Sequence, residues 1–314
     1  MSQNIDEEVI NLVDKLKEKY EENSQDFKAY LEGLLYQSYT NYWDYVQTDT
    51  LLTLQKPRTP IKDELIFIIY HQITELYFKL CIHELEQLAE LKDNLKADLF
   101  SERIRRVNAY FRNLTASFEI MINGMEKEQF LKFRMSLLPA SGFQSAQYRM
   151  IEIMAADFLR LVAKDKRDTF DANSSIEEMF EHIYWKAGAT ELKTGKKTLT
   201  LTLFEKKYSK KLIRLAKEYK NKNIWELYKS LPVAEQKNEK LIDELKLFDK
   251  NVNINWPLVH YKSAVRYLQK DPNDIAATGG TNWQKYLPPR FQLRIFYPEL
   301  FTPEELENWG KHID

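Results

Sequence analysis

Two of the five histidines in this sequence lie where an imidazole could do chemistry, and both fall in helical patterns. His71 lies in FIIYHQITELYFKL, the most apolar stretch of the chain, where a buried imidazole needs a hydrogen-bond partner or a ligand. His260 follows Pro257 in the first turn of a predicted helix, and helix-borne imidazoles are common haem ligands. Taken alone, each residue also fits a core histidine with a satisfied hydrogen bond.

Aromatic residues accompany His71 along one face of its predicted helix. Phe67, His71, Thr74 and Phe78 follow the spacing i, i+4, i+7, i+11. An imidazole flanked by phenyl rings suits the wall of a pocket for a flat aromatic ligand, although most such stripes are simply core. Arg149, in SGFQSAQYRMIE, fits either a partly buried salt bridge or a clamp for a substrate carboxylate, because guanidinium binds carboxylates with two parallel bonds.

Other metal chemistry finds little support in the motifs. The Glu-x-x-His pairs of di-iron proteins and the HExxH zinc motif are both absent. His71 and Glu75 lie one turn apart and could join another histidine in a non-haem iron site. The loop ATGGTNW at 277–283 lets backbone approach a ligand closely and offers the Thr278 hydroxyl, yet it matches no nucleotide-binding motif.

The elements that must position these residues are helices. The 314 residues include only 8 glycines and 10 prolines, so long helices are expected, and we predict an all-α fold. Apolar side chains surround the first half of the helix predicted for residues 63–94, which predicts that this helix is buried on all sides in the core. Residues 198–203 (TLTLTL) alternate like a short strand, but Thr202 and Glu205 form a capping-box pattern that favours a helix from about 203. The other main predicted helices span 5–23, 98–122, 142–164, 233–250 and 255–270.

Composition excludes several classes of protein. The net charge of −1 gives no global field to attract nucleic acid or an anionic membrane, so neither is an expected partner. Cys81 is the only cysteine, which rules out an internal disulfide and a cysteine-based metal site and fits the reducing cytoplasm. No apolar run reaches 18 residues and no signal peptide is visible.

We divide the chain into an N-terminal helical arm, a main domain and an insert. Residues 1–40 form the arm, which we expect in subunit contacts. Residues 41–188 and 251–314 form the main helical domain that carries both histidines. Residues 189–250 are expected to form a helical insert or subdomain.

Three segments together resemble the tryptophan 2,3-dioxygenase family. They are YWDY at 42–45, DELIFIIYHQITELYFKLCIHEL at 63–85 and LLPASGFQSAQYRMIE at 137–152, followed by His260 and the TGG at 278–280. The resemblance spans roughly residues 40–300. The sequence departs from the family at Ala277, where the family loop has glycine, and by extra residues around 270–275.

The resemblance implies a role for each residue. His260 resembles the proximal haem ligand, and His71 the distal histidine that contacts the indole N–H of the substrate. Phe67 resembles an apolar wall against the indole. Arg149 resembles the arginine that binds the substrate carboxylate. Thr278 resembles the loop threonine that meets the amino-acid end of the substrate. Two pocket tyrosines, Tyr42 and Tyr45, come in the family from a neighbouring subunit of a homotetramer.

The resemblance thus implies a haem b enzyme that opens the indole ring of L-tryptophan with O2 to give N-formylkynurenine. Two alternatives stay open at this point. One is a related haem oxygenase that acts on another aromatic amino acid. The other is a haem-binding helical protein without catalysis.

Overall fold

The regular structure of the chain is helical. The computed structural model describes residues 6–37, 39–91, 94–171, 173–191, 194–269, 284 and 287–311. Within these ranges the extended pairing is limited to two isolated bridges, Val162–Ile183 and Thr190–Lys197. The all-α prediction is confirmed. The chain forms two compact units, Met1–Leu54 and Gln55–Asp314.

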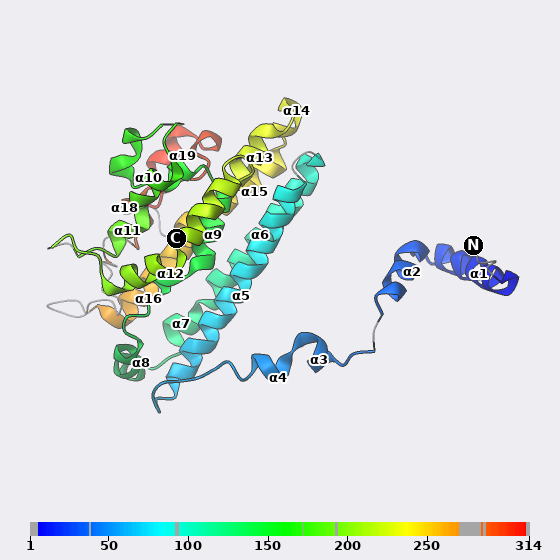
Figure 1. The fold of residues 1–314 in the computed structure, drawn as a ribbon, viewed down its shortest axis with the longest axis horizontal. Helices are drawn as coiled ribbons and strands as arrows, with labels where there is room; N and C mark the ends of the chain where they lie inside the picture. The colour runs from blue at the N-terminus through cyan, green and yellow to red at the C-terminus, as the bar shows by residue number, and fades with distance from the viewer. Residues whose placement is uncertain are drawn as a thin grey trace. The chain divides into compact units, whose positions relative to one another are not determined.

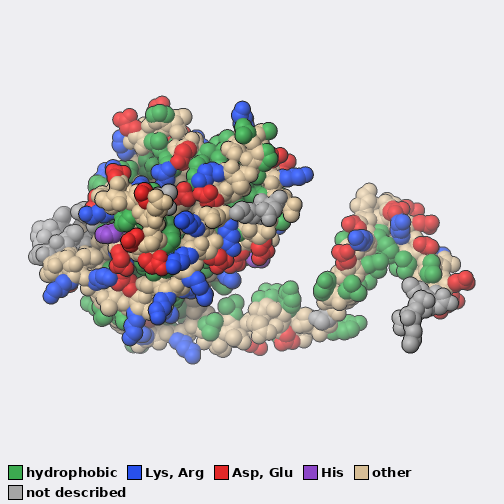
Figure 2. All heavy atoms as spheres, turned by 45° about the horizontal axis from the view of Figure 1, so that its top comes forward, with side chains coloured by type: hydrophobic (Ala, Val, Ile, Leu, Met, Phe, Trp, Pro, Cys, Tyr) green, Lys and Arg blue, Asp and Glu red, His purple; other side chains and the backbone are tan. Residues whose placement is uncertain are grey.

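The first unit consists of short and medium helices without a core of their own. Asp6 and Asp26 begin its two longer helices, because each carboxylate accepts backbone N–H groups of the first turn. None of the helices in this unit buries a residue, and Figure 2 shows hydrophobic side chains along its surface. The helices are α1 (Glu7–Glu22), α2 (Phe27–Leu35), α3 (Tyr42–Val46) and α4 (Thr48–Leu51).

The second unit is built on five helices that pack in a row. Helix α6 (Ala97–Ser117) lies between α15 (Glu239–Lys250) and α5 (Asp63–Glu90). On its other side α5 packs against α9 (Ala146–Ala155), which in turn contacts α12 (Leu199–Tyr219). Figure 1 shows α5, α6, α12 and α15 running along a similar direction. Core side chains such as Phe78, Phe111 and Phe248 fill the space between these helices.

Shorter helices complete this unit. The α-helices are α7 (Glu119–Asn123), α8 (Lys127–Phe133), α10 (Ile176–Glu181), α11 (Tyr184–Gly188), α13 (Ile224–Ser230), α14 (Val233–Gln236), α16 (Trp256–Leu268), α18 (Pro289–Gln292) and α19 (Pro303–Glu307). The 3-10 turns are η2 (Arg134–Leu137), η3 (Gly142–Gln144), η4 (Phe158–Leu161), η5 (Lys164–Thr169) and η7 (Pro298–Leu300), and η6 (Asn251–Asn255) is a π-helical turn.

The predicted domain limits differ from the observed units. Residues 41–54, which we placed in the main domain, lie in the first unit. Residues 189–250 lie in the second unit and do not separate from it, because α12 packs on α9 and α15 packs on α6. The segment that we expected to be an insert is therefore part of the central packing.

Two predicted helix limits are wrong. Helix α12 begins at Leu199, because the Thr198 hydroxyl accepts the N–H of Leu201, so Thr202 is not the cap and TLTLTL is not a strand. The predicted helix 142–164 is broken: α9 ends at Ala155, and Ala156 has extended backbone. No glycine or proline marks this break. Ala155 and Ala156 are both buried, so we attribute the end of the helix to tertiary packing.

Helix α5 is buried on one side only. Tyr70 and Phe78 lie in the core, but its opposite face exposes apolar side chains, so the prediction of burial all round is wrong. By length and mean hydropathy α5 alone, among the described helices, would be long and apolar enough to span a membrane, a test that core helices also pass. The exposed residues on this face are Leu65, Ile69, Ile73, Leu76 and Leu80.

Candidate functional site

The two histidines lie on separate helices of the second unit, His71 on α5 and His260 on α16. The Nδ1 atom of His71 lies 2.7 Å from the carbonyl oxygen of Phe67, and Nδ1 of His260 lies 3.0 Å from that of Trp256. A carbonyl can only accept, so Nδ1 carries the proton of each neutral ring. In both rings the lone pair of Nε2 is therefore left for a ligand or a donor.

The surroundings hold both imidazoles neutral. Burial lowers the pKa of His71, and the Phe67 carbonyl and Glu75 offset only part of this effect. Burial also lowers the pKa of His260 to about 4, and the Trp256 carbonyl offsets only part of this effect. A neutral imidazole is the form that binds a metal ion.

Aromatic rings line the region around both histidines. The Phe67 ring lies 4.1 Å from the His71 ring, and the Phe118 ring lies 4.5 Å from the His260 ring, between ring centroids. Trp256 packs edge-on against His260 at 4.5 Å. Both histidines are only partly buried, so each ring keeps an accessible side within this aromatic surround. Of the four residues predicted to share one face of α5, Thr74 and Phe78 are buried, whereas Phe67 and His71 are partly buried.

These features fit an iron porphyrin. A haem needs a neutral axial imidazole whose second nitrogen is held by an acceptor, and His260 meets both conditions through the Trp256 carbonyl. It also needs apolar and aromatic walls, which Phe118 and Phe67 provide. The non-haem alternative lacks a ligand set: across the described ranges no three histidine, cysteine or carboxylate side chains gather as a metal site. Glu75, its predicted carboxylate, accepts a hydrogen bond from Gln147 at 2.8 Å.

Arg149 lies in a buried charged cluster. Its guanidinium donates to Glu152 at 3.0 Å and to the hydroxyl of Tyr184, and Arg294 donates to the same carboxylate and hydroxyl. The Tyr184 hydroxyl donates to Glu152. Burial opposes the charge of Arg149, but Tyr184 and Glu152 more than offset it and raise its pKa. A substrate carboxylate would have to compete with Glu152 for this guanidinium.

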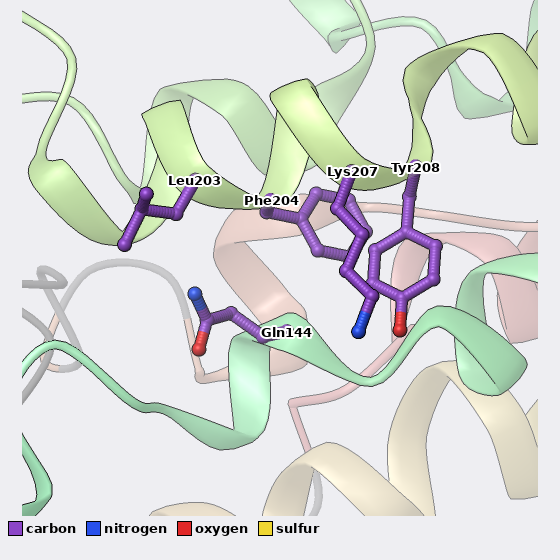
Figure 3. A pocket seen from close by; sticks show the side chains of 5 residues that line it. All are labelled: Gln144, Leu203, Phe204, Lys207 and Tyr208. Carbon is purple, nitrogen blue, oxygen red and sulfur yellow. The ribbon is translucent and has the colours of Figure 1, made fainter.

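The remaining predicted site residues lie elsewhere. Tyr42 and Tyr45 are exposed on α3 in the first unit, with 72% and 80% of their surface accessible. Thr278 and the rest of the ATGGTNW loop lie outside the described residues. A pocket of about 280 Å³ opens between η3 and α12 (Figure 3), and it is lined by none of the predicted residues. The side chains that line it are Gln144, Leu203, Phe204, Lys207 and Tyr208.

Sequence reasoning missed a second buried arginine near Phe67. Arg134 opens η2 and is only 5% exposed, and burial lowers its pKa. Its neighbour Phe133 contacts the Phe67 ring edge-on at 5.7 Å, and Phe130 lies 6.4 Å from the same ring. The signal in the sequence was Phe130 and Phe133 at helical spacing directly before an arginine.

Comparison with known proteins decides the family. The model of the family described as tryptophan 2,3-dioxygenase matches residues 32–253, which is more than half of the chain. The chain belongs to the tryptophan 2,3-dioxygenase family. The resemblance found in the sequence is thereby confirmed. The matched range contains His71, Arg134 and Arg149, whereas His260 and Thr278 lie beyond its end.

Individual members of the tryptophan 2,3-dioxygenase family match over a shorter stretch. The enzyme of Herpetosiphon aurantiacus is 42% identical over 115 residues, which cover 36% of this chain and 44% of that protein. The enzymes of a Ruegeria species and of Anaeromyxobacter dehalogenans are 39% and 40% identical over 113 residues, covering 40% and 42% of their lengths. Each match thus covers less than half of the relative's length.

Proposed function

We propose that the chain is a haem-dependent dioxygenase that opens the indole ring of L-tryptophan with O2 to give N-formylkynurenine. The observation that carries this proposal is the pair of histidines, His71 and His260, each set among aromatic rings with Nδ1 held by a carbonyl and Nε2 left for a ligand. Family membership supplies the substrate class. Both oxygen atoms end in the product, so the reaction balances without a separate reductant.

His260 would hold the cofactor. Its Nε2 lone pair would bind the iron, and the bond from Nδ1–H to the Trp256 carbonyl would fix the ring and make Nε2 more basic. Haem b would supply the binding and activation of O2. The protein supplies orientation, exclusion of water and a hydrogen bond.

His71 and Phe67 would place the indole. The free Nε2 of His71 accepts the indole N–H, because Nδ1 is committed to the Phe67 carbonyl. The Phe67 ring, 4.1 Å from the imidazole, forms an apolar wall beside it. A neutral His71 is required for this role, which agrees with its lowered pKa.

Two arginines are candidates for the substrate carboxylate. The resemblance implies Arg149, whose guanidinium already serves Glu152. Arg134 is the second candidate, because it is buried and the residue before it, Phe133, packs against the ring of Phe67. We propose that Arg134 binds the carboxylate and that the Arg149 cluster supports the wall of the site. Thr278 would then meet the amino end of the substrate, and Tyr42 and Tyr45 would complete a neighbouring subunit's site.

Replacing Arg134 with alanine is expected to raise KM for L-tryptophan roughly tenfold to a hundredfold, because a charge-assisted hydrogen bond made to bound substrate is lost. The measurement is steady-state formation of N-formylkynurenine by the haem-loaded enzyme. Lys132→Ala, which removes an exposed cation two positions away, is the control and should leave KM unchanged. A rise in KM with Arg149→Ala but not with Arg134→Ala would return the clamp to Arg149.

We also propose a cytoplasmic homotetramer. The apolar face of α5 and the apolar side chains of the first unit are exposed in the single chain, and such surfaces mark sites of association. Cys81 is a buried free thiol, which suits a reducing compartment.

The test of the overall function is product analysis. Ferrous haem-loaded protein with L-tryptophan and air should yield a product that has gained two oxygen atoms. A product that has gained one oxygen atom from another aromatic amino acid would favour the first alternative. Absence of turnover by a protein that holds haem would favour the second.

A further inference from the structure

The helix that carries His260 contains one extra residue. Helices α15 and α16 are joined by η6 without a break, so the chain is helical from Glu239 to Leu268. The N–H of Trp256 donates to the carbonyl of Asn251, five residues back instead of four. A π-turn of this kind is a one-residue insertion into an α-helix, and such turns are frequent at functional sites.

This extra residue decides which way His260 faces. The core residues of α15 are Leu241, Leu245 and Phe248, a spacing that continues to Val252. At about 3.6 residues per turn, an unbroken α-helix would continue this line through Val259 to Arg266. With one extra residue the line instead runs through Trp256, His260 and Tyr267.

The observed burial follows the second line. Trp256 and Tyr267 are buried and Arg266 is exposed, as the shifted line requires. His260 lies between Trp256 and Tyr267 on this line, with its ring against Trp256 and Phe118. Val259, which the unshifted line would place inward, is also buried, so the two lines differ most clearly at Arg266 and Tyr267.

Side chains from neighbouring helices hold the π-turn in place. The hydroxyl of Tyr148 on α9 donates to the Val252 carbonyl at 2.8 Å. Asn108 on α6 donates to the carbonyl of Glu244 at 2.9 Å and accepts from the amide of Asn251 at 3.0 Å. Tyr148 and Asn108 are themselves buried, so both contacts are shielded from water.

We propose that Tyr148 and Asn108 are positioning residues for His260: they keep the extra residue of the helix within Asn251–Asn255, upstream of the imidazole. The inference rests on the proposed role of His260 as iron ligand. If the π-turn moved past residue 260, the helix before it would return to α-geometry. His260 would then rotate by about 100° away from its present side of the helix.

The test measures how firmly the iron is held in Tyr148→Phe. This change removes the hydroxyl that donates to the Val252 carbonyl and also lies against Arg294, so His260 should occupy two orientations. We expect haem transfer from the ferric protein to apomyoglobin to become about fivefold faster, the effect of one lost hydrogen bond. The iron–histidine stretching band of the ferrous protein should broaden or shift. Asn108→Ala should act in the same direction.

A deletion provides the rescue that separates positioning from general stability. Removing Ile254 takes out the extra residue, so a regular α-helix would present His260 on the inward side with no π-turn left to move. In the Tyr148→Phe background this deletion should restore haem retention to within about twofold of wild type. Tyr228→Phe is the matched control, because its hydroxyl donates to the Gln236 carbonyl at 2.8 Å, away from His260. It should lose thermal stability without faster haem loss.

Three results have distinct meanings. Equal haem loss in Tyr148→Phe and Tyr228→Phe, or a failed rescue by the Ile254 deletion, overturns the positioning role while His260 remains the ligand. A wild-type protein whose haem retention does not depend on His260 overturns the proposed function itself, and the inference with it. Faster loss in Tyr148→Phe together with rescue by the deletion supports the inference.

Discussion

Replacing His260 with alanine is expected to lower the affinity for haem more than about 100-fold, since even a partner of a metal-bound histidine contributes tenfold to a hundredfold. The change removes the proposed haem ligand, an imidazole whose Nδ1 is bonded to the Trp256 carbonyl and whose Nε2 lone pair is left for a metal ion. Turnover of L-tryptophan should be lost with the haem. The measurement is a haem titration of the apoprotein followed by its absorption spectrum.

His83→Ala is the control for this change. His83 is an exposed histidine on α5, the helix that carries His71, so its loss should leave haem affinity and the spectrum as in wild type. Added imidazole should restore the ligand-bound spectrum of His260→Ala, because the small molecule can occupy the vacated side-chain space. Tight haem binding by His260→Ala without imidazole would contradict the assigned ligand.

Replacing Glu152 with glutamine is expected to lower the free energy of unfolding by about 3–5 kcal/mol, because it leaves buried charge without its partner. The carboxylate is fully buried and is the counter-charge of two guanidinium groups, Arg149 and Arg294. Native proteins are stable by only about 5–15 kcal/mol, so the change removes a large part of the total. Urea unfolding followed by circular dichroism measures it.

Glu102→Gln provides a matched comparison on the surface. Glu102 also pairs with two arginines, Arg105 and Arg106, and Arg105 above all holds its pKa down at about 2. These three side chains keep 37%, 46% and 43% of their surface accessible, so solvent screens them and the urea midpoint should hardly move. Equal midpoints for the two variants would show that the Arg149 cluster does not carry the buried charge that we assign to it.

The helices and the candidate histidines could be predicted from local pattern. The apolar period of residues 63–94 marked α5, and Pro257 marked the segment that carries His260, although α16 continues from α15 through η6 and Pro257 therefore does not begin a helix. Both signals are local, because helix starts and apolar faces depend on residues within a few turns. The family was predictable from the segments around His71 and Arg149.

The remaining features depend on tertiary contacts that no local pattern carries. In the sequence, Arg149 looks the same whether it binds Glu152 or a substrate carboxylate, so its buried cluster could not be predicted. The end of α9 at Ala155 has no breaker residue. The π-turn at Asn251–Asn255 could not be predicted, because one extra residue rotates the apolar face of a long helix but leaves its composition almost unchanged. The exposed face of α5 reads as core in a single sequence.

The most direct test of the account is the position of the iron in a crystal of the haem-loaded protein, located by anomalous scattering at the iron edge. The account predicts iron bonded to Nε2 of His260, with Nδ1 still on the Trp256 carbonyl and His71 on the opposite side of the porphyrin. Iron bonded to another side chain, or a His260 ring turned away from the porphyrin, would contradict it.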